Sequence, residues 1–215
     1  MLKFSRVIKE ILDKILGWLA LIVLSPCFWL LAGLVRFETP GPAFFRQERI
    51  GKDGHPFVAY KFRSMVDNAT AMGLGLNVAV NDSRITRMGR FLRSTSLDEL
   101  PQLFNVIKGE MSLVGPRPTL AYQVARYNEV QRRRLRVKPG ITGWAQINGR
   151  NAIPWEERIR LDVWYVDHWS LGLDLYILLR TMKTWVCREG LYGPSGVNYD
   201  FNPDGNAAEA ASNLV

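Results

Sequence analysis

The longest apolar stretch lies near the start of the chain. Residues 15–35 carry no charged side chain, and twenty-one helical residues span about 31 Å, the hydrocarbon thickness of a bilayer. The stretch is too long for the core of a signal peptide, lacks a small-residue cleavage pattern and continues into a basic region. We therefore predict a membrane segment, with a buried core helix as the alternative.

A proline divides this segment near its middle. Pro26 removes the hydrogen bond that the Ile22 carbonyl would accept, and the Ser25 hydroxyl can reach back to that carbonyl instead. Ser25 and Pro26 therefore predict a stabilised bend. Because basic residues flank the stretch on both sides, the positive-inside rule places both ends in the cytoplasm. We expect residues 1–38 to form a re-entrant helix that dips into one leaflet and returns, with a kinked full span as the alternative.

A β-hairpin is predicted after the membrane segment. Residues 43–50 and 56–63 are rich in aromatic residues and have the pattern of two strands, and they flank an Asp-Gly turn. The alternation of the second arm places Lys61 and Arg63 on one face. These two cations form either an ordinary solvated strand face or a phosphate clamp.

Helical periodicity dominates the rest of the chain. The spacing of apolar positions predicts helices over residues 83–93, 119–137, 155–169 and 171–187. The first of these ends at Arg93, directly upstream of a pair of carboxylates. The second ends in a cluster of arginines, which we interpret as a patch for anionic lipid headgroups because a membrane segment is already present.

Three segments lack this periodicity. Residues 66–81 are polar and contain glycine, which predicts a loop that could act as a mobile lid. Residues 139–151 combine three glycines with Gln146 and Arg150, a composition typical of a binding loop for a polar ligand. After Gly190 the chain turns to small and polar residues, so we expect a loose tail.

The stretch from Ser96 to Pro118 carries the candidate chemistry. With Ser96 as the helix cap, Glu99 completes a capping box; with Asp98 as the cap, the following proline falls in the first turn. Local pattern alone supports a helix cap and a catalytic pair about equally. Prolines on both sides restrict Arg117, which suits a bidentate contact with phosphate, although a plain turn has the same pattern.

Composition narrows the partners and the cellular setting. The net charge of +8 and the pI near 9.7 favour phosphate-bearing partners or an anionic membrane surface. Cys27 and Cys187 are the two cysteines, so neither a disulfide framework nor a zinc cluster can form, which fits a reducing setting. His55 and His168 are isolated from each other, and we interpret both as structural.

Six motifs, in order along the chain, resemble the bacterial sugar transferase family, in the form of its small monotopic polyprenol-phosphate phosphoglycosyl transferases. The motifs are Ser25-Pro26, Tyr60-Lys61-Phe62-Arg63-Ser64-Met65, residues 96–100, Leu103-Phe104-Asn105-Val106, Gly115-Pro116-Arg117-Pro118 and residues 139–151. Together they cover roughly residues 1–190. Agreement at six places makes a chance resemblance very improbable.

The resemblance implies an architecture as well as an activity. We expect a mainly α protein, of the α+β kind with a small β-hairpin, that is a monotopic membrane protein. Residues 1–38 would form the re-entrant membrane helix, 39–190 a cytoplasmic catalytic domain with interfacial helices, and 191–215 a loose C-terminal tail. The implied location is the cytoplasmic face of the bacterial inner membrane.

The resemblance implies transfer of a sugar-1-phosphate from a UDP-sugar to undecaprenyl phosphate with release of UMP, the first step of glycoconjugate or exopolysaccharide synthesis. Asp98 would be the nucleophile that holds the sugar phosphate covalently, and Glu99, together with Asp98, would bind Mg²⁺. Arg117 would meet the nucleotide. The residues that would line the diphosphate and the lipid phosphate are Lys61, Arg63, Arg93, Gln146 and Arg150.

Two other functions are compatible with parts of the pattern. A membrane-anchored basic binding or regulatory protein, in which Asp98 and Glu99 only cap a helix, explains the charge and the anchor but leaves Arg117 and the loop 139–151 unused. A transferase that moves the sugar without its phosphate would release UDP. Among partners we expect inner-membrane lipids and no nucleic acid, with a homodimer as an option; the sequence identifies neither the sugar nor the pathway.

Overall fold

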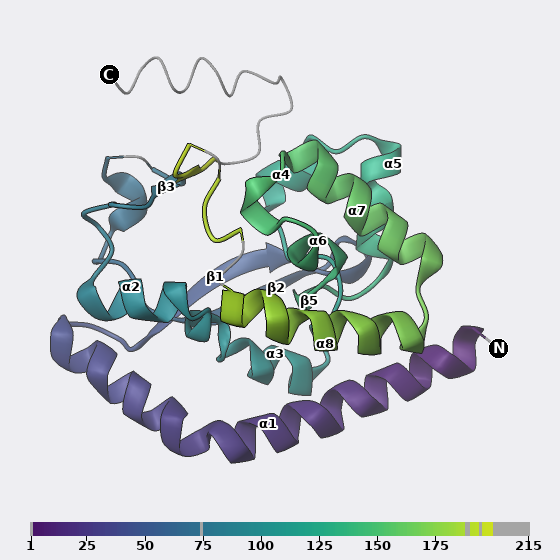
Figure 1. Ribbon diagram of the computed structural model, residues 1–215, viewed down its shortest axis with the longest axis horizontal. Coiled ribbons are helices and arrows are strands. Elements are labelled where there is room, and N and C mark those ends of the chain that lie inside the picture. Colours follow the sequence, from purple (N-terminus) through teal and green to yellow (C-terminus); the bar gives the residue numbers. More distant parts are fainter. Residues whose placement is uncertain (1, 74, 188–189, 194, 200–215) are drawn as a thin grey trace.

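The computed structural model describes residues 2–73, 75–187, 190–193 and 195–199. Its first element is one long helix, α1 (Leu2–Glu38), which forms the lower layer of the molecule in Figure 1. The helix continues through Pro26 but changes direction near its middle. The Ser25 hydroxyl donates to the Ile22 carbonyl oxygen at 2.8 Å, so the predicted hydrogen bond at the bend is confirmed.

Helix α1 is attached to the rest of the chain near both of its ends. Near its start, Lys9 Nζ donates to Asp174 Oδ2 at 2.6 Å and to the Val114 carbonyl oxygen at 3.0 Å. Near its end, the Glu38 carboxylate accepts the backbone N–H groups of Arg87 and Met88 at 2.7 and 2.9 Å. The helix therefore lies along the folded domain and does not project from it.

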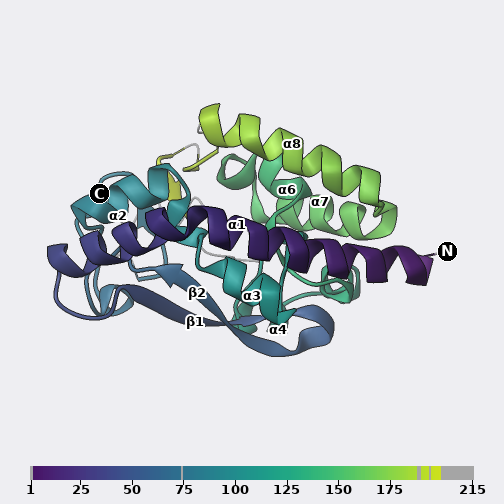
Figure 2. The same cartoon turned by 90° about the horizontal axis from the view of Figure 1, so that it is seen from below.

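Much of the apolar surface of α1 faces away from the domain. Its most apolar 18-residue window has a mean hydropathy of 2.2, and 22% of that window is buried. By length and composition, α1 is the one helix among the described residues that could cross a membrane. Exposed apolar side chains also lie on α8 (Leu171–Cys187), namely Leu175, Leu179 and Met182. Figure 2 looks onto α1, with α8 visible on one flank.

The predicted hairpin is confirmed. β1 (Phe44–Ile50) pairs with β2 (Pro56–Phe62) in antiparallel register. The turn contains Asp53-Gly54, both with positive φ (54° and 83°), a conformation that this residue pair adopts readily. On one side of the hairpin, the Phe62 ring lies 5.1 Å from the ring of Phe28 in α1, so an aromatic cluster joins the hairpin to the long helix.

Two short helices flank the predicted carboxylate pair. α2 (Arg87–Ser94) begins later than expected, because the Thr86 hydroxyl caps it by accepting the Gly89 N–H at 2.9 Å. α3 (Gln102–Lys108) follows the carboxylates and packs between α1 and β2. On α3, Leu103 and Val106 are buried. The two carboxylates thus lie in a turn between α2 and α3, and both of these helices contact α1.

A short parallel sheet brings two loops together. β4 (Ser112–Val114) pairs with β5 (Gly140–Thr142), and parallel strands place their carboxyl ends at the same edge. The arginine turn 115–118 leaves β4 at that edge, and α6 (Trp144–Ile147) follows β5. Gly115 must be glycine here, because a Cβ at this position would lie 2.4 Å from the Lys138 carbonyl oxygen.

The prediction of one helix over residues 119–137 is wrong. The structure has α4 (Ala121–Ala125), α5 (Glu129–Arg132) and a 3-10 turn (Arg133–Arg136) in its place. Asn128 interrupts the helix, because its side chain accepts the Gln131 N–H at 2.9 Å and so caps a new one.

The arginine cluster at the end of this segment is not a continuous surface patch. Arg134 is 3% exposed, and its Nη2 donates to Asp162 Oδ2 of α7 (Trp155–His168) at 2.5 Å. Arg133 pairs with Asp167 on the same helix. Two of the clustered arginines therefore hold α7, whose position, like that of α8, agrees with the sequence prediction.

The loop over residues 66–81 is organised by one buried arginine. Arg84 forms an ion pair with Asp82 at 2.7 Å and donates to four loop carbonyls, those of Ala69, Met72, Gly75 and Asn77. The loop includes β3 (Val78–Ala79), which pairs with β6 (Val197–Asn198). Residues 191–193 and 195–199 of the predicted loose tail are thus folded against the domain, whereas 194 and 200–215 lie outside the described residues.

Candidate active site

Asp98 and Glu99 lie in a 3-10 turn (Leu97–Glu99) between α2 and α3. Ser96 precedes the turn with a φ of 54°, in the left-handed region, and its side chain makes no capping hydrogen bond. At the start of α3 the cap position is Pro101, again without a side-chain cap. Both predicted capping arrangements are therefore wrong, and the two carboxylates are available for other contacts.

Glu99 is held by two cations from distant parts of the chain. Its Oε1 accepts from Lys61 Nζ at 2.7 Å, and its two oxygens accept from Arg117 Nη1 and Nη2 at 3.1 and 2.5 Å. Burial alone would raise the pKa of Glu99, but Arg117 and Lys61 outweigh it and hold the pKa well below its usual range. Glu99 is therefore ionised at neutral pH.

Asp98 has a different environment from its neighbour. It is 8% exposed, and no residue that the structure describes donates a hydrogen bond to its carboxylate. Burial and the adjacent Glu99 raise its pKa, while Lys61, Arg93 and Arg117 oppose the shift. Asp98 lines two cavities, and carboxylates with shifted pKa values in a cavity wall are concentrated at functional sites.

Three more predicted residues lie at this site. Arg150 Nη2 donates to the Ser96 hydroxyl at 3.2 Å. Arg93 lines the same small cavity as Asp98. Gln146 is 9% exposed, and within the described residues neither its amide oxygen nor its amide nitrogen has a hydrogen-bond partner. An unpartnered amide at a cavity wall is suited to bind a polar ligand.

Arg63, by contrast, directs its guanidinium toward the end of α1. Its Nη1 donates to the Pro40 carbonyl oxygen at 2.5 Å, and its Nη2 donates to those of Thr39 and Val35 at 2.7 and 3.5 Å. These bonds satisfy carbonyl groups at and beyond the helix terminus. Arg63 also lines the large cavity described next, but its observed hydrogen bonds fasten β2 to α1.

A large cavity opens on the hairpin side of Asp98. Its volume is about 440 Å³. Its walls come from the hairpin, the 66–81 loop, the arginine turn and α7. Among its lining residues are Arg49, Lys61, Arg93, Asp98, Arg117, Trp155 and Arg158. A pocket of this size with several cations suits a phosphorylated small molecule.

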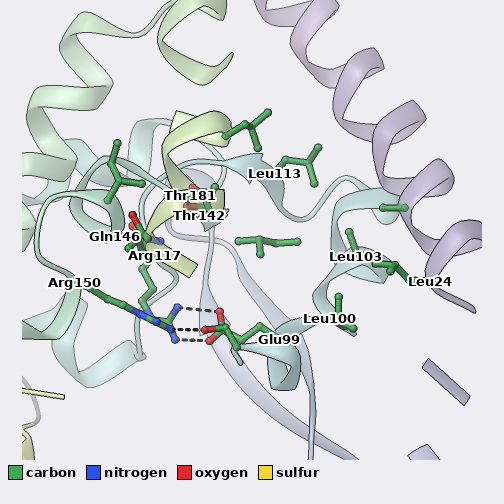
Figure 3. Close-up of a pocket in the computed structure, with 16 residues that line it drawn as sticks. Leu24, Glu99, Leu100, Leu103, Leu113, Arg117, Thr142, Gln146, Arg150 and Thr181 are labelled. Atoms are coloured by element: carbon green, nitrogen blue, oxygen red, sulfur yellow. Dashed lines mark hydrogen bonds and ion pairs between the residues drawn. The ribbon is translucent and has the colours of Figure 1, made fainter. Parts of the chain in front are cut away.

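A groove with mostly apolar walls lies on the other side of the carboxylate pair. We call it the apolar groove; it measures about 290 Å³. The apolar residues that line it are Ala20 and Leu24 of α1, Leu100, Leu103, Leu113, Ile141, Ile147 and Leu178 of α8. At one end lie Glu99, Arg117, Gln146 and Arg150, with Leu24 and Leu103 toward the other (Figure 3). The groove thus connects the α1 surface with the charged centre.

A small cavity of about 110 Å³ lies between the large cavity and the apolar groove and shares lining residues with both. It shares Asp98, Lys61 and Arg93 with the large cavity, and Glu99 and Arg150 with the apolar groove. The carboxylate pair therefore lies at the junction between the cation-rich large cavity and the apolar groove.

Sequence reasoning missed several residues of this junction. Asn105 is fully buried and ties α3 to β2, accepting the Tyr60 N–H at 3.2 Å and donating to the Val58 carbonyl oxygen at 2.7 Å. In the sequence, the one sign of its importance is that Asn105 belongs to the family motif at residues 103–106. Arg158 lies in the wall of the large cavity, with its guanidinium 4.8 Å from the centre of the Trp155 ring. Burial lowers the pKa of Arg158 to about 10. In the sequence, its helical spacing looks the same as that of a solvent-exposed arginine.

The side chains at the junction that could bind a metal ion are the carboxylates of Asp98 and Glu99. Among the described residues, no group of three or more His, Cys, Asp and Glu side chains is placed to hold a metal ion. Asp98 and Glu99 supply two adjacent carboxylates, which is the contribution that a protein makes when Mg²⁺ takes its remaining ligands from phosphate and water. The residues present therefore fit Mg²⁺ bound jointly with a phosphorylated substrate.

Comparison with known proteins gives consistent similarities. The chain is 48% identical over 185 residues to the uncharacterized sugar transferase EpsL of Bacillus subtilis, covering 86% of this chain and 90% of the relative. It is 42% identical over 202 residues to the undecaprenyl-phosphate galactose phosphotransferase of Salmonella typhimurium, covering 87% of this chain and 42% of the relative.

A third relative is the UDP-glucose:undecaprenyl-phosphate glucose-1-phosphate transferase of Escherichia coli, 41% identical over 188 residues, which cover 83% of this chain and 40% of the relative. The chain therefore spans nearly all of the Bacillus protein but less than half the length of the Salmonella and Escherichia proteins. The model of the family described as bacterial sugar transferase matches residues 4–188. By this match and these identities, the chain belongs to the bacterial sugar transferase family.

Proposed function

We propose that this protein transfers a sugar-1-phosphate from a UDP-sugar to undecaprenyl phosphate, releases UMP, and so begins synthesis of an exopolysaccharide or related glycoconjugate. The observation that carries the proposal is the position of Asp98. Its carboxylate has no hydrogen-bond partner among the described residues, and Asp98 lines both the cation-rich large cavity and the small cavity that adjoins the apolar groove. The names of the Salmonella and Escherichia relatives support both substrates.

The large cavity suits the UDP-sugar. Arg49, Lys61, Arg93, Arg117 and Arg158 line it, and several cations around one site lower the repulsion that a carboxylate meets when it approaches a diphosphate. The Arg117 guanidinium is fixed by two hydrogen bonds to Glu99. Its backbone is fixed as well, because Arg134 Nη2 donates to the Arg117 carbonyl oxygen at 3.0 Å.

The apolar groove suits the prenyl chain of the acceptor. Its leucine and isoleucine walls begin at α1, whose exposed apolar surface fits a lipid environment, and end at Gln146 and Arg150. At the charged end of the groove lie Arg150 and the Gln146 amide, whose polar atoms have no partner among the described residues. Both side chains would provide hydrogen-bond donors for the acceptor's phosphate. On this proposal the two substrates approach Asp98 from opposite sides.

The reaction proceeds in two displacements at one phosphorus atom. A carboxylate oxygen of Asp98 forms a bond to the phosphorus that carries the sugar, and the bond from this phosphorus to the bridging oxygen breaks, so that UMP leaves with the electron pair. A phosphate oxygen of undecaprenyl phosphate then bonds to the same phosphorus, and the bond to Asp98 breaks. The carboxylate is regenerated, and the product is the sugar linked to undecaprenyl diphosphate.

Glu99 and Asp98 would hold Mg²⁺ in this proposal. The ion would neutralise charge on the diphosphate when both are bound. Glu99, whose pKa is held well below its usual range by Arg117 and Lys61, keeps its charge over the whole neutral range. Asp98, whose pKa burial raises, has no competing hydrogen-bond donor and is left for the attack.

We further propose that α1 is re-entrant and that the domain lies at the cytoplasmic face of the membrane. Contacts near both ends of α1, from Lys9 to Asp174 and from Glu38 to Arg87, support this arrangement. A helix held along one domain at both ends has no free segment with which to reach the opposite leaflet. Cysteines placed singly at Ser5 and Phe37 should both be shielded from an impermeant reagent added outside the cell; labelling at one of the two from outside would contradict the topology.

The activity is tested with detergent-solubilised protein, undecaprenyl phosphate, Mg²⁺ and a panel of UDP-sugars. We expect release of UMP and, without undecaprenyl phosphate, a burst of about one UMP per protein molecule, because the sugar phosphate stays on Asp98. Asp98→Asn should abolish both, whereas the matched control Asp53→Asn, in the exposed hairpin turn, should leave them unchanged. Release of UDP would favour transfer of the sugar alone, and no release from any donor would favour a binding protein.

A further inference from the structure

The chain returns to the active site after the part matched by the family model. That match ends at residue 188, and the structure then describes residues 190–193 and 195–199, which we call the C-terminal strap. β6 of the strap pairs with β3, and the Val80 N–H donates to the Gly196 carbonyl oxygen at 2.9 Å. The strap thus lies across the loop that forms one wall of the large cavity.

Both ends of the strap are also fastened to residues 149–155. The Asn151 N–H donates to the Gly190 carbonyl oxygen at 3.1 Å, and Asn151 Nδ2 donates to the Leu191 carbonyl oxygen at 2.8 Å. Trp155 Nε1 donates to the Tyr199 carbonyl oxygen at 3.0 Å. Gly190 lies so close to Gly149 that a Cβ would be 2.4 Å from the Gly149 carbonyl oxygen.

The strap also holds its own shape. Asn198 Nδ2 donates to the Leu191 carbonyl oxygen at 3.1 Å, and Asn198 Oδ1 accepts the Gly193 N–H at 3.0 Å. These bonds link the two ends of the strap. Tyr192 is half-buried, and no described residue hydrogen-bonds to its hydroxyl. A hydroxyl in such a position is free to serve a ligand.

Three strap residues line the small cavity beside Asp98, namely Leu191, Tyr192 and Asn198. The other residues around it divide by charge. Lys61, Arg93, Arg117 and Arg150 are cations, Asp98 and Glu99 are the carboxylates, and the remaining neutral members are Val78 and Asn151. The strap therefore supplies three of the five neutral residues that line the small cavity beside Asp98.

We infer that the C-terminal strap contacts the sugar of the UDP-sugar and that Tyr192 and Leu191 help to select which sugar is accepted. This inference rests on the proposed function, because the phosphorus that Asp98 attacks is the one bonded to the sugar. A sugar is neutral and rich in hydroxyl groups, so its complement is a neutral wall with hydrogen-bonding and apolar groups. The cations around the same cavity are matched to the phosphates instead.

The inference is tested by discrimination between sugars. Tyr192→Phe removes only the hydroxyl, and Leu191→Ala enlarges the cavity. For each variant we compare kcat/KM values for UDP-glucose, UDP-galactose and their N-acetylated counterparts. We expect the ratio between at least two of these donors to change by about tenfold. Tyr192→Phe loses a hydrogen bond to a substrate hydroxyl, and Leu191→Ala makes room for a larger substituent. Tyr176→Phe makes the same chemical change on the exposed part of α8 and should leave the ratios unchanged.

A binding measurement separates this inference from the proposed reaction. By titration calorimetry, Tyr192→Phe should weaken binding of the preferred UDP-sugar but not of UDP, which has no sugar to contact the strap. If the wild type releases no UMP, the proposed reaction fails, and the calorimetric comparison still decides on the strap. Equal effects on UDP-sugar and UDP, or unchanged ratios among all sugars in both variants, would overturn the inference.

Discussion

Asp98 and Glu99 are neighbours, yet the structure predicts that amide substitutions at the two positions change stability in opposite directions. Asp98 has a pKa above its ordinary value of 3.8 because of burial and Glu99. The folded protein therefore holds the charged form less well than the unfolded chain does. This penalty is absent below pH 3.8 and fully present above the folded pKa. At pH 7 Asp98→Asn should therefore raise stability, by about 0.5–2 kcal/mol, the usual size of one stabilising substitution.

Glu99 behaves in the reverse sense. Its folded pKa lies well below the ordinary value of 4.5, so its contribution to stability is fully present above pH 4.5 and is lost as the pH falls through the folded value. Glu99→Gln removes the charge that accepts three hydrogen bonds from Lys61 and Arg117. Both cations retain solvent contact, so at pH 7 we expect a loss of about 1.5–3 kcal/mol, below the value for a fully buried pair.

Thermal unfolding at pH 7 in one detergent measures both effects. For a chain of this size, 1 kcal/mol corresponds to about 2–4 °C in Tm, so Asp98→Asn should gain roughly 1–8 °C and Glu99→Gln should lose roughly 3–12 °C. The difference between the two variants should shrink as the pH is lowered toward 4. A Tm for Asp98→Asn at or below that of the wild type would refute the reasoning from its burial and missing hydrogen bonds.

Three further predictions address the site and the fold. Arg93→Gln removes a cation that lowers the pKa of Asp98, so the acid limb of the pH–rate profile of UMP release should move to higher pH; an unmoved limb would exclude Arg93 from the environment of the nucleophile. Arg84→Met breaks a buried ion pair and four loop contacts and should cost about 3–5 kcal/mol in denaturant unfolding. Phe28→Ala should cost about 3–5 kcal/mol in the same assay, whereas Phe37→Ala, at a position that is 92% exposed, should cost less than about 0.5 kcal/mol.

Local chemistry in the sequence was enough to predict the bend, the hairpin and the last two helices. Ser25 and Pro26 act within one helical turn, and the Asp53-Gly54 turn fixes its own backbone. For α7 and α8, apolar spacing continues over several turns, so that the signal is strong. In each case the interactions that decide the structure join residues close together in the sequence.

The mistaken prediction of one helix over residues 119–137 has a local cause and a distant one. The helix expected over 119–137 is divided by a local cap at Asn128, and its end is held by an ion pair between Arg134 and Asp162, twenty-eight residues away. Arg63, which is predicted to bind substrate, lines the large cavity and also donates to the end of α1, twenty-three to twenty-eight residues upstream. Sequence pattern does not state which distant partner a cation meets.

The candidate site shows the same limit. The residue types were predicted, but the separation of Asp98 and Glu99 into an unpartnered and a twice-paired carboxylate depends on Lys61 and Arg117, which come from other elements. The strap was expected to be part of a loose tail, because its small and polar composition gives no sign of the β3 edge with which it pairs. These contacts become visible only once the chain is folded.

Arg117 is the one described residue that lines the large cavity, the small cavity and the apolar groove together. Apart from Arg117, the large cavity and the apolar groove share no lining residue. An evolving protein of this architecture can therefore exchange residues around one chamber without disturbing the other, provided that this arginine and its supports are retained. On the proposed function, this division would allow the transferred sugar to diversify in evolution while the lipid carrier stays the same.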